Sequence, residues 1–554
     1  MTMVLMWINP VSTTLSNAAE WQWSTEVESV VSSETNAHPR AFLWIPPGCT
    51  HVRAVVVGQH NMEEEGILEH PEFRRVMAEL GIAEVWVTPG LDLVFDYNKG
   101  AGEKFDGMMK SLADISGYQE LALAPVIPIG HSAAASYPWN FAAWNPERTL
   151  AAISISGQWP WYVADKMPSW EGKNIDGVPG LVTIGEYEWA GERGTGGLKL
   201  RQDHPELAMS VLAEPGAGHF DFSDDKVKFI ALYIRKACEY RLPSPAPRTA
   251  GTAPANGAVE LKPIKPGDNG WLVDRWRGNS GPKAPSAPVG NYSGDPAQAY
   301  WTFDGEMAKA TEELQAKYRG QKVCLLGYLQ KDGITDQNPK MHGQVPLKFE
   351  PSSDDGITFN LKGAFLDAVP DGRPARWVGQ EKGAVVEHPP VDKAETIVIS
   401  RICGPVVKLG DDTFSMRFYR MGMNNPRRSN DIWLVATYAG DDDYRRIVQQ
   451  AQLRFPLRND KGEDQVITFP TIADQKQGAA PVQLAAKSSS GMQVYYYVRE
   501  GPVEIEGDKL VFTTIPPRSA FPVKVTVVAW QWGRSTDPKV KTAEPVTQTF
   551  LIAK

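Results

Sequence analysis

The strongest constraint on the fold is a repeated alternation of short apolar runs and helical stretches between residues 40 and 240. The apolar runs cover 41–45, 52–57, 84–88, 125–129, 150–156, 181–184 and 209–213, and helical patterns over 71–80, 103–115, 133–144 and 224–240 lie between them. Parallel strands need long crossover connections, usually helices, so this order predicts a mostly parallel sheet covered on both faces. The predicted fold class for 40–242 is therefore α/β, with a doubly wound sheet.

The remaining chain differs in composition and in the spacing of its apolar runs, and this pattern predicts β-sandwich-type domains. A chain of 554 residues is too long for one core. Residues 243–295 are rich in Pro, Gly and Ser, which indicates a linker or a segment that wraps a surface. A helix is expected over 296–318, and short strands with regular turns fill the rest of 296–463 and, more tightly, 464–554.

Charge and hydropathy exclude two classes of function. The net charge is -9 and no basic stripe is present, so a nucleic-acid surface is not expected. No run of 18 apolar residues occurs, which excludes a membrane-spanning helix. Residues 1–39 form an N-terminal tail whose apolar stretch and small residues resemble a shortened export signal, although no Lys or Arg precedes them. A simple disordered tail is the alternative.

The cysteines give no sign of a metal site. Cys49, Cys238, Cys324 and Cys403 lie far apart and lack the spacing of zinc ligands. Buried thiols are favoured, and a disulfide between Cys49 and Cys238 is the alternative. The acidic turn at 440–443 is interpreted as solvated rather than as a calcium site. No metal and no cofactor are expected.

A candidate nucleophile follows the apolar run 125–129. The segment Gly130-His131-Ser132-Ala133-Ala134 precedes a helical stretch, and a serine in such a tight turn needs small neighbours on both sides. Amide groups at the start of a helix are free to bind a developing oxyanion, and the Ala133 N–H is the first candidate donor. The alternative interpretation is that Ser132 only caps the helix.

A candidate base and two candidate acids follow in the chain. Gly216-Ala217-Gly218-His219 comes directly after the run 209–213, and a neutral imidazole suits proton transfer near pH 7. An acid is needed to orient that imidazole. Glu186 and Glu188 both follow the run 181–184, and the residues themselves leave the choice open.

Serine first, carboxylate next and histidine last, each after a strand, resemble the α/β-hydrolase superfamily over about a third of the chain. The resemblance implies ester hydrolysis through an acyl-enzyme. It favours Glu188 over Glu186, because the acid commonly lies three residues beyond a glycine, here Gly185. It also places a second oxyanion donor after an early strand, at Gln59 or His60, although the usual His-Gly pair is absent there.

Aromatic residues are frequent in the loops around these positions. The chain has 18 tryptophans. Trp159, Trp161 and Trp189 are expected to contact substrate together with His131, because flat aromatic faces pack against sugar rings or aryl groups. The alternative is that these rings fill a core under long loops.

The last segment resembles the bacterial Ig-like domains that end many exported enzymes. The resemblance rests on 481–484, 488–491, 494–498, 501–502, 507–510 and 523–527. It implies a secreted or periplasmic esterase that removes acetyl or feruloyl groups from polysaccharides or oligosaccharides. The expected partner is an ester-decorated carbohydrate or small ester. A peptidase or aryl-ester hydrolase on the same scaffold and a non-catalytic carbohydrate-binding surface protein are the alternatives, and the oligomeric state stays open.

Overall fold

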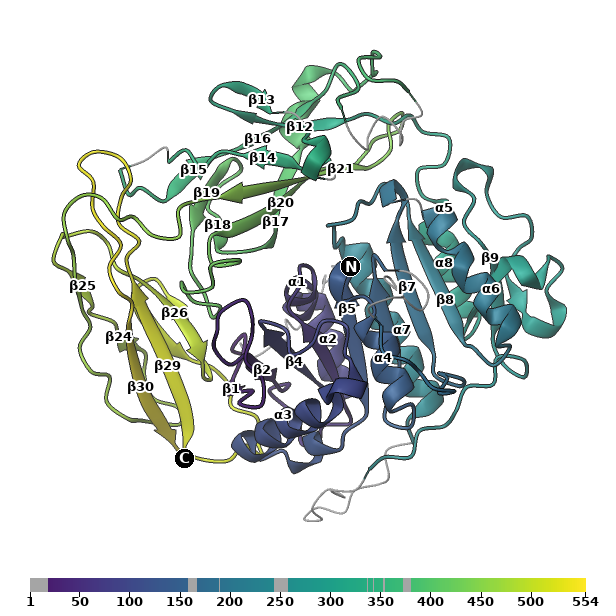
Figure 1. Cartoon of the computed structure of the whole chain (residues 1–554), viewed down its shortest axis with the longest axis horizontal. Coiled ribbons are helices and arrows are strands. Elements are labelled where there is room, and N and C mark those ends of the chain that lie inside the picture. Colours follow the sequence, from purple (N-terminus) through teal and green to yellow (C-terminus); the bar gives the residue numbers. More distant parts are fainter. Residues whose placement is uncertain are drawn as a thin grey trace, which may run out of the picture.

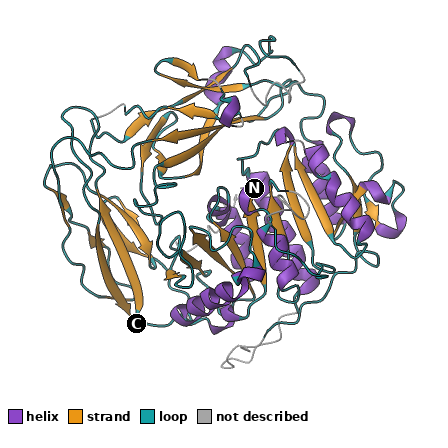
Figure 2. Ribbon diagram, viewed as in Figure 1, coloured by secondary structure: helices purple, strands orange, loops and turns teal. Residues whose placement is uncertain are grey.

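The computed structural model describes residues 18–157, 167–188, 190–243, 258–335, 337–341, 343–351, 354–371 and 380–554. Three parts follow one another along the chain (Figure 1): an α/β unit up to residue 317, a middle β region over 322–455 and a C-terminal β region over 464–554. Figure 2 shows that the helices gather in the α/β unit. No helix in the described part of the chain is both long and apolar enough to span a membrane.

The α/β unit is built on one eight-stranded sheet. Its strands are β1 (Trp23–Glu26), β2 (Arg40–Trp44), β3 (Ala54–Gln59), β4 (Ile82–Thr88), β5 (Val126–His131), β6 (Ala152–Ile155), β7 (Gly180–Gly185) and β8 (Met209–Glu214). The spatial order is β1-β2-β4-β3-β5-β6-β7-β8, in which β1 and β2 pair antiparallel and the strands from β4 to β8 run parallel. This mostly parallel sheet agrees with the predicted α/β fold class.

Helices cover both faces of the sheet, as the alternation predicts. The helices are α1 (Glu64–Leu68), α2 (Pro71–Leu80), α3 (Ala101–Ser116), α4 (Tyr137–Trp144), α5 (Ala190–Arg193), α6 (Thr195–Asp203), α7 (Asp224–Arg241) and α8 (Gly305–Ala316). Helices α3 and α4 share a core with Val55 and Val57, whereas α2 and α7 share a core with Val56 on the opposite face. Successive strand side chains point to opposite faces, which divides the apolar run of β3 between the two cores.

Local sequence explains the bounds of α2. His70 caps the first turn by accepting the Glu72 N–H, and Pro71 occupies the first helical position, where its missing N–H costs nothing. Gly81 ends the helix in the left-handed conformation at φ 70°. The helix predicted over 133–144 differs at its start: residues Ser132–Ala134 form a 3-10 turn, and α4 begins at Tyr137.

Two segments outside 40–242 belong physically to the α/β unit. Strand β1 lies in the expected N-terminal tail and pairs with β2. Residues 258–316 wrap the unit and add β9 (Trp271–Asp274), β10 (Ala287–Pro288) and β11 (Ala299–Thr302). The helix expected from residue 296 is wrong over 296–304, because a 3-10 turn and strand β11 come first and Trp301 of β11 is buried in the core of α2 and α7. Asp304 then caps α8 by accepting the Met307 N–H.

The middle β region consists of three sheets around a common core. Its strands are β12 (Leu326–Gln330), β13 (Gly333–Thr335), β14 (Val345–Leu347), β15 (Thr358–Asn360), β16 (Lys362–Phe365), β17 (Val398–Cys403), β18 (Val406–Lys408), β19 (Thr413–Met416), β20 (Asp431–Tyr438) and β21 (Ile447–Arg454). The sheets are β13-β12-β16, β14-β21-β20-β17 and β15-β19-β18. Met62 of the α/β unit is buried in the same core, next to the Cys403 thiol.

The C-terminal β region is also made of short sheets. Its strands are β22 (Ile467–Thr468), β23 (Gln475–Lys476), β24 (Val482–Gln483), β25 (Lys487–Ser488), β26 (Tyr495–Glu500), β27 (Val503–Glu506), β28 (Lys509–Phe512), β29 (Val523–Trp530) and β30 (Val546–Ala553). The sheets are β22-β25, β23-β30-β29-β26 and β24-β28-β27. The Ig-like character of this region stays a prediction.

The C-terminal β region returns to the beginning of the chain (Figure 1). Glu500 accepts a 2.8 Å hydrogen bond from the Ser24 hydroxyl, and Arg518 forms a 2.7 Å ion pair with Glu120. The Ala520 N–H donates to the Ser116 carbonyl at the end of α3, at 2.9 Å. All four cysteines are buried thiols, so the alternative disulfide between Cys49 and Cys238 is not formed.

Candidate active site

Ser132 occupies a strained turn at the carboxyl end of β5. Its φ is 51°, which non-glycine residues adopt rarely and at a cost of roughly 1–3 kcal/mol. Gly130 makes the turn possible, because a Cβ atom there would lie 2.1 Å from the Ala134 carbonyl oxygen. The turn leaves Ser132 partly exposed although both His131 and Ala134 are buried. A nucleophile in this position faces solvent while its flanking residues are fixed in the core.

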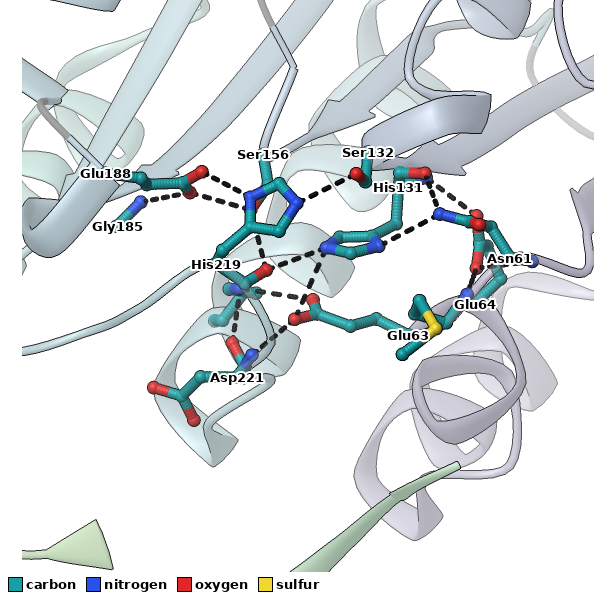
Figure 3. Close-up of polar contacts among 12 residues, drawn as sticks. Asn61, Glu63, Glu64, His131, Ser132, Ser156, Gly185, Glu188, His219 and Asp221 are labelled. Carbon is teal, nitrogen blue, oxygen red and sulfur yellow. Dashed lines mark hydrogen bonds and ion pairs between the residues drawn. The ribbon is translucent and has the colours of Figure 1, made fainter. Parts of the chain in front are cut away.

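Ser132, His219 and Glu188 form one hydrogen-bonded chain across three strand ends (Figure 3). The Ser132 Oγ lies 2.8 Å from His219 Nε2, and His219 Nδ1 lies 2.7 Å from Glu188 Oε2. An ionised carboxylate only accepts hydrogen bonds, so Nδ1 carries the imidazole proton. Nε2 is then free to accept the serine proton. The residues come from the turns after β5, β7 and β8, whose carboxyl ends meet at one edge of the sheet.

Glu188 is fully buried and nevertheless charged. Burial alone raises the pKa of Glu188, but His219, Arg193 and the Gly185 N–H outweigh it and lower the pKa to about 2. The Arg193 Nη1 lies 2.7 Å from the same oxygen, Oε2, that contacts His219. The carboxylate is therefore ionised throughout the neutral range and is held against the imidazole.

Ser156 fixes the other oxygen of Glu188. Its hydroxyl donates to Oε1 at 2.7 Å, and the Gly185 N–H donates to the same oxygen at 2.9 Å. Ser156 follows β6 and, like Ser132, has a positive φ, here 52°. Sequence reasoning missed both Ser156 and Arg193; for Ser156, a hydroxyl directly after a predicted buried strand was the available signal.

Glu186 takes a different place from Glu188. Its Oε2 accepts the Gly216 N–H at 2.8 Å and pairs with Arg445 of the middle β region at 2.7 Å. Burial raises the pKa of Glu186, and Arg445 opposes that shift. Of the two carboxylates left open by the sequence, only Glu188 contacts the imidazole of His219 among the hydrogen bonds of the described residues.

The structure separates the three candidate oxyanion donors. Ala133 is exposed and lies in the 3-10 turn that begins at Ser132, where the amide groups of a first turn lack intrahelical partners. The amide prediction for His60 is wrong, because its N–H donates to the Val87 carbonyl at 2.8 Å and its ring is buried. The Gln59 side chain is used to hold the backbone of Asp92. Gln59 stays a prediction as the second donor.

Glu64 braces the loop after β3 against the nucleophile turn. Its Oε1 accepts the His131 N–H at 2.7 Å, and its Oε2 accepts the N–H groups of Asn61 and Met62 at 3.2 and 2.9 Å. Burial raises the pKa of Glu64 to about 7 although these amides oppose the shift. The Asn61 side chain donates to the His131 carbonyl at 2.8 Å. Neither residue was found from the sequence.

His131 does not reach substrate. Its side chain is fully buried, and its Nε2 lies 2.8 Å from the His219 carbonyl oxygen. Burial and the nearby His219 lower its pKa well below the ordinary value, so the ring is neutral. Nε2 therefore carries the proton and donates to the loop of the base. The substrate-contact prediction for His131 is wrong, and the residue instead holds His219 in place.

The remaining predicted site residues cannot be placed. Trp159, Trp161 and Trp189 lie outside the described residues. Within the described ranges, no group of three or more His, Cys, Asp or Glu side chains is arranged to hold a metal ion.

No family model matches this sequence, and no curated protein matches it. Several solved structures resemble about two fifths of the chain. A fluorophosphonate-binding serine hydrolase of Staphylococcus aureus is 12% identical, with 39% of this chain and 97% of that chain covered and a TM-score of 0.28. A dienelactone hydrolase from Anabaena variabilis is 15% identical, with 40% and 98% covered and a TM-score of 0.27. A soluble variant of the Saccharomyces cerevisiae monoglyceride lipase is 14% identical, with 42% and 99% covered and a TM-score of 0.26.

Proposed function

We propose that this protein is a serine hydrolase that cleaves carboxylic esters through an acyl-enzyme. The observation that carries the proposal is the continuous chain from Ser132 Oγ through both nitrogens of His219 to Glu188. A serine hydroxyl is a weak nucleophile unless an adjacent base removes its proton, and this arrangement places such a base at hydrogen-bond distance.

Acylation uses the three residues in turn. His219 Nε2 accepts the proton of Ser132 as Oγ attacks the ester carbonyl, and Glu188 stabilises the imidazolium that forms. The Ala133 N–H binds the developing oxyanion, with the Gln59 N–H as the proposed second donor. His219 then returns the proton to the departing alcohol, which leaves an ester between Ser132 and the acyl group.

Deacylation repeats the same proton transfers with water. A water molecule loses a proton to His219 Nε2 and attacks the acyl-enzyme, and collapse of the intermediate returns that proton to Ser132. His219 is partly exposed, with a side-chain exposure of 22%, which allows water to approach its outer edge. The products are a carboxylic acid and the free enzyme.

The proposed substrates are acetyl or feruloyl esters on polysaccharides or oligosaccharides. The support is the resemblance of the C-terminal segment to domains of exported enzymes and the aromatic residues of the predicted substrate loops. Export to the periplasm or the medium belongs to the same proposal. Peptide or aryl-ester hydrolysis on the same scaffold is the second candidate, because the triad chemistry is identical.

Release of p-nitrophenol from its acetate tests the proposal. We expect Ser132→Ala to lower kcat by roughly 10⁶-fold, whereas Ser111→Ala, on the exposed face of α3, keeps full activity. Mass spectrometry after treatment with a fluorophosphonate should place the adduct on Ser132. Full activity of Ser132→Ala would contradict the assignment. Acetylated xylan, feruloylated oligosaccharides and peptides, assayed in parallel, distinguish the substrate classes, and cleavage of peptides alone would overturn the esterase proposal.

A further inference from the structure

The loop that carries His219 is held from outside the α/β unit by one side chain. Arg446 of the middle β region forms two hydrogen bonds with the Asp221 carboxylate, at 2.7 and 2.9 Å. The same guanidinium donates to the Gly216 carbonyl at 3.0 Å. Gly216 precedes His219 and Asp221 follows it, so Arg446 spans the loop on both sides of the base.

The backbone contact around this guanidinium leaves no room for side chains. A Cβ atom on Gly216 would lie 2.4 Å from the Arg446 carbonyl oxygen, and one on Gly218 would lie 2.2 Å from the Gln450 amide nitrogen. The two glycines of the Gly-Ala-Gly-His motif are therefore required because the middle β region packs directly against them. Gly216 also has a φ of 71°, which favours glycine independently.

The neighbouring residues of the middle β region hold the loop of the acid. The Arg445 guanidinium pairs with Glu186 at 2.7 Å, and the Tyr187 hydroxyl donates to the Arg446 carbonyl at 3.1 Å. The Tyr187 N–H donates to Ala217 at 3.0 Å, which joins the two loops to each other. The segment 445–450 thus contacts residues on both sides of His219 and the two residues that precede Glu188.

Arg446 also balances a buried charge. Asp221 is 3% exposed and lies beside two further buried carboxylates, Glu63 and Glu214, with Lys226 as their shared cation. The Asp221 N–H donates to Glu63 at 2.5 Å. Without Arg446, the Asp221 carboxylate loses its ion-pair partner. The nearby Lys226 ammonium group is already paired with Glu63 and Glu214. A buried carboxylate that loses its partner is strongly unfavourable. We therefore expect the loop to shift so that the Asp221 carboxylate moves towards water.

From these contacts we propose that Arg446 is a positioning residue of the reaction, and that the middle β region completes the catalytic apparatus by fixing the loop of His219. This inference rests on the proposed function, in which His219 is the base. Arg446 touches neither nucleophile nor base, and acts through Asp221 and Gly216.

The first test is the full-length Arg446→Met variant. Arg454→Met is the matched control, because Arg454 ends the strand β21 that begins directly after Arg446, and it pairs with Asp431 near the surface. We expect Arg446→Met to lower kcat by roughly 10²-fold, as small displacements of a reacting group do, with a smaller change in KM. Arg454→Met should match the unaltered protein. A kcat of Arg446→Met within twofold of the unaltered protein would overturn the proposal.

A proton NMR measurement provides a readout that does not depend on turnover. The proton between His219 Nδ1 and Glu188 should give a far-downfield resonance, assigned by its loss in Glu188→Gln. We expect this resonance to broaden or disappear in Arg446→Met and to persist in Arg454→Met. An unchanged resonance in Arg446→Met would overturn the positioning role. If the unaltered protein hydrolyses no ester, the proposed function fails, while the comparison of resonances still decides the role of Arg446.

Arg446→Lys keeps the proposal testable if the methionine variant does not fold. A lysine supplies a cation for Asp221, but a single ammonium group cannot reproduce the planar fork that reaches Asp221 and Gly216 together. We expect Arg446→Lys to fold and to have a kcat roughly tenfold below that of the unaltered protein. This value lies between those of the unaltered protein and Arg446→Met. A kcat equal to that of the unaltered protein would show that charge alone suffices and would overturn the bridging role.

Discussion

The sheet edge that carries the site and the middle β region beside it are built in opposite ways. Among described residues, the non-glycine residues with positive φ all lie at or before Tyr318, and two of them are Ser132 and Ser156. Beyond that point, only glycines among the described residues adopt such backbone. The middle β region encloses a largely apolar core with two thiols, Cys324 and Cys403, whereas the sheet edge buries carboxylates and histidines. Two of these strained residues thus lie where the proposed chemistry takes place, beside a region whose described non-glycine residues have no positive φ after Tyr318.

Among variants that keep Ser132, the largest expected effect comes from removing the charge of Glu188. Glu188→Gln keeps the shape of the side chain but lets the imidazole adopt the wrong tautomer, so we expect kcat to fall by roughly 10⁴-fold. The loss of kcat in Glu186→Gln, two residues earlier, should be at least a hundredfold smaller. Steady-state kinetics on p-nitrophenyl acetate decide between them. Equal losses in the two variants would refute the assignment of the acid.

A pair of glycine substitutions compares the two regions directly. Gly130→Ala forces the turn of Ser132 to shift, and we expect a kcat lower by roughly 10²-fold. In the middle β region, the Cβ atom added by Gly404→Ala would lie 2.2 Å from the Asp431 carbonyl oxygen, at a position whose φ is 95°. This substitution should lower the free energy of unfolding by about 1–3 kcal/mol while kcat stays within twofold. Urea unfolding and kinetics measure both. The comparison fails if Gly130→Ala leaves kcat unchanged.

The depressed pKa of Glu188 predicts a loss of stability in acid. The folded pKa is about 2 and the ordinary value is 4.5, so ionised Glu188 stabilises the folded state above pH 4.5. That contribution, about 3 kcal/mol, is lost as pH falls from 4.5 towards 2. The difference in unfolding free energy between the unaltered protein and Glu188→Gln should therefore shrink across this window. A constant difference from pH 6 to pH 3 would contradict the prediction.

Ser156→Ala should produce the smallest of these effects. It removes one hydrogen bond to the ionised Glu188 and leaves the contacts with Arg193 and Gly185 in place. A charged hydrogen bond contributes about 1.5–3 kcal/mol, of which only part acts on the orientation of His219, so we expect kcat to fall by roughly tenfold. Ser111→Ala is the control. A loss as large as that of Glu188→Gln would mean that Ser156 acts directly on substrate.

Much of the α/β unit could be predicted because its signals are local. The apolar runs that predict the buried strands recur in β2 to β8, and α2 has the bounds that its capping residues indicate. Strand β1 and the wrapping segment 258–316 could not be predicted in this way. Trp301 and Ile264 become core residues only because distant helices lie over them. The composition left a linker and a surface-wrapping segment open over 243–295 and indicated a helix from 296, and only tertiary packing explains the strand that contains Trp301.

The site shows the same limit at the level of single residues. Ser132 and His219 were found because each follows a strand in a motif of small residues. His131 was misinterpreted because neighbouring side chains on a strand point in opposite directions, which turns its ring into the core as Ser132 faces outward. The contact between Arg446 and Asp221 joins positions 225 residues apart, and no local pattern encodes it.

The return of the C-terminal β region to the α/β unit sets the order of events during synthesis. Ala520 contacts the end of α3 and Arg518 contacts Glu120 just after it, and both residues leave the ribosome about 400 residues after their partners. Domains fold from the N-terminus as the chain emerges, at roughly 5–20 residues per second. The α/β unit therefore folds with this surface uncovered for tens of seconds. During that interval the nascent chain exposes a surface that its own last segment later covers.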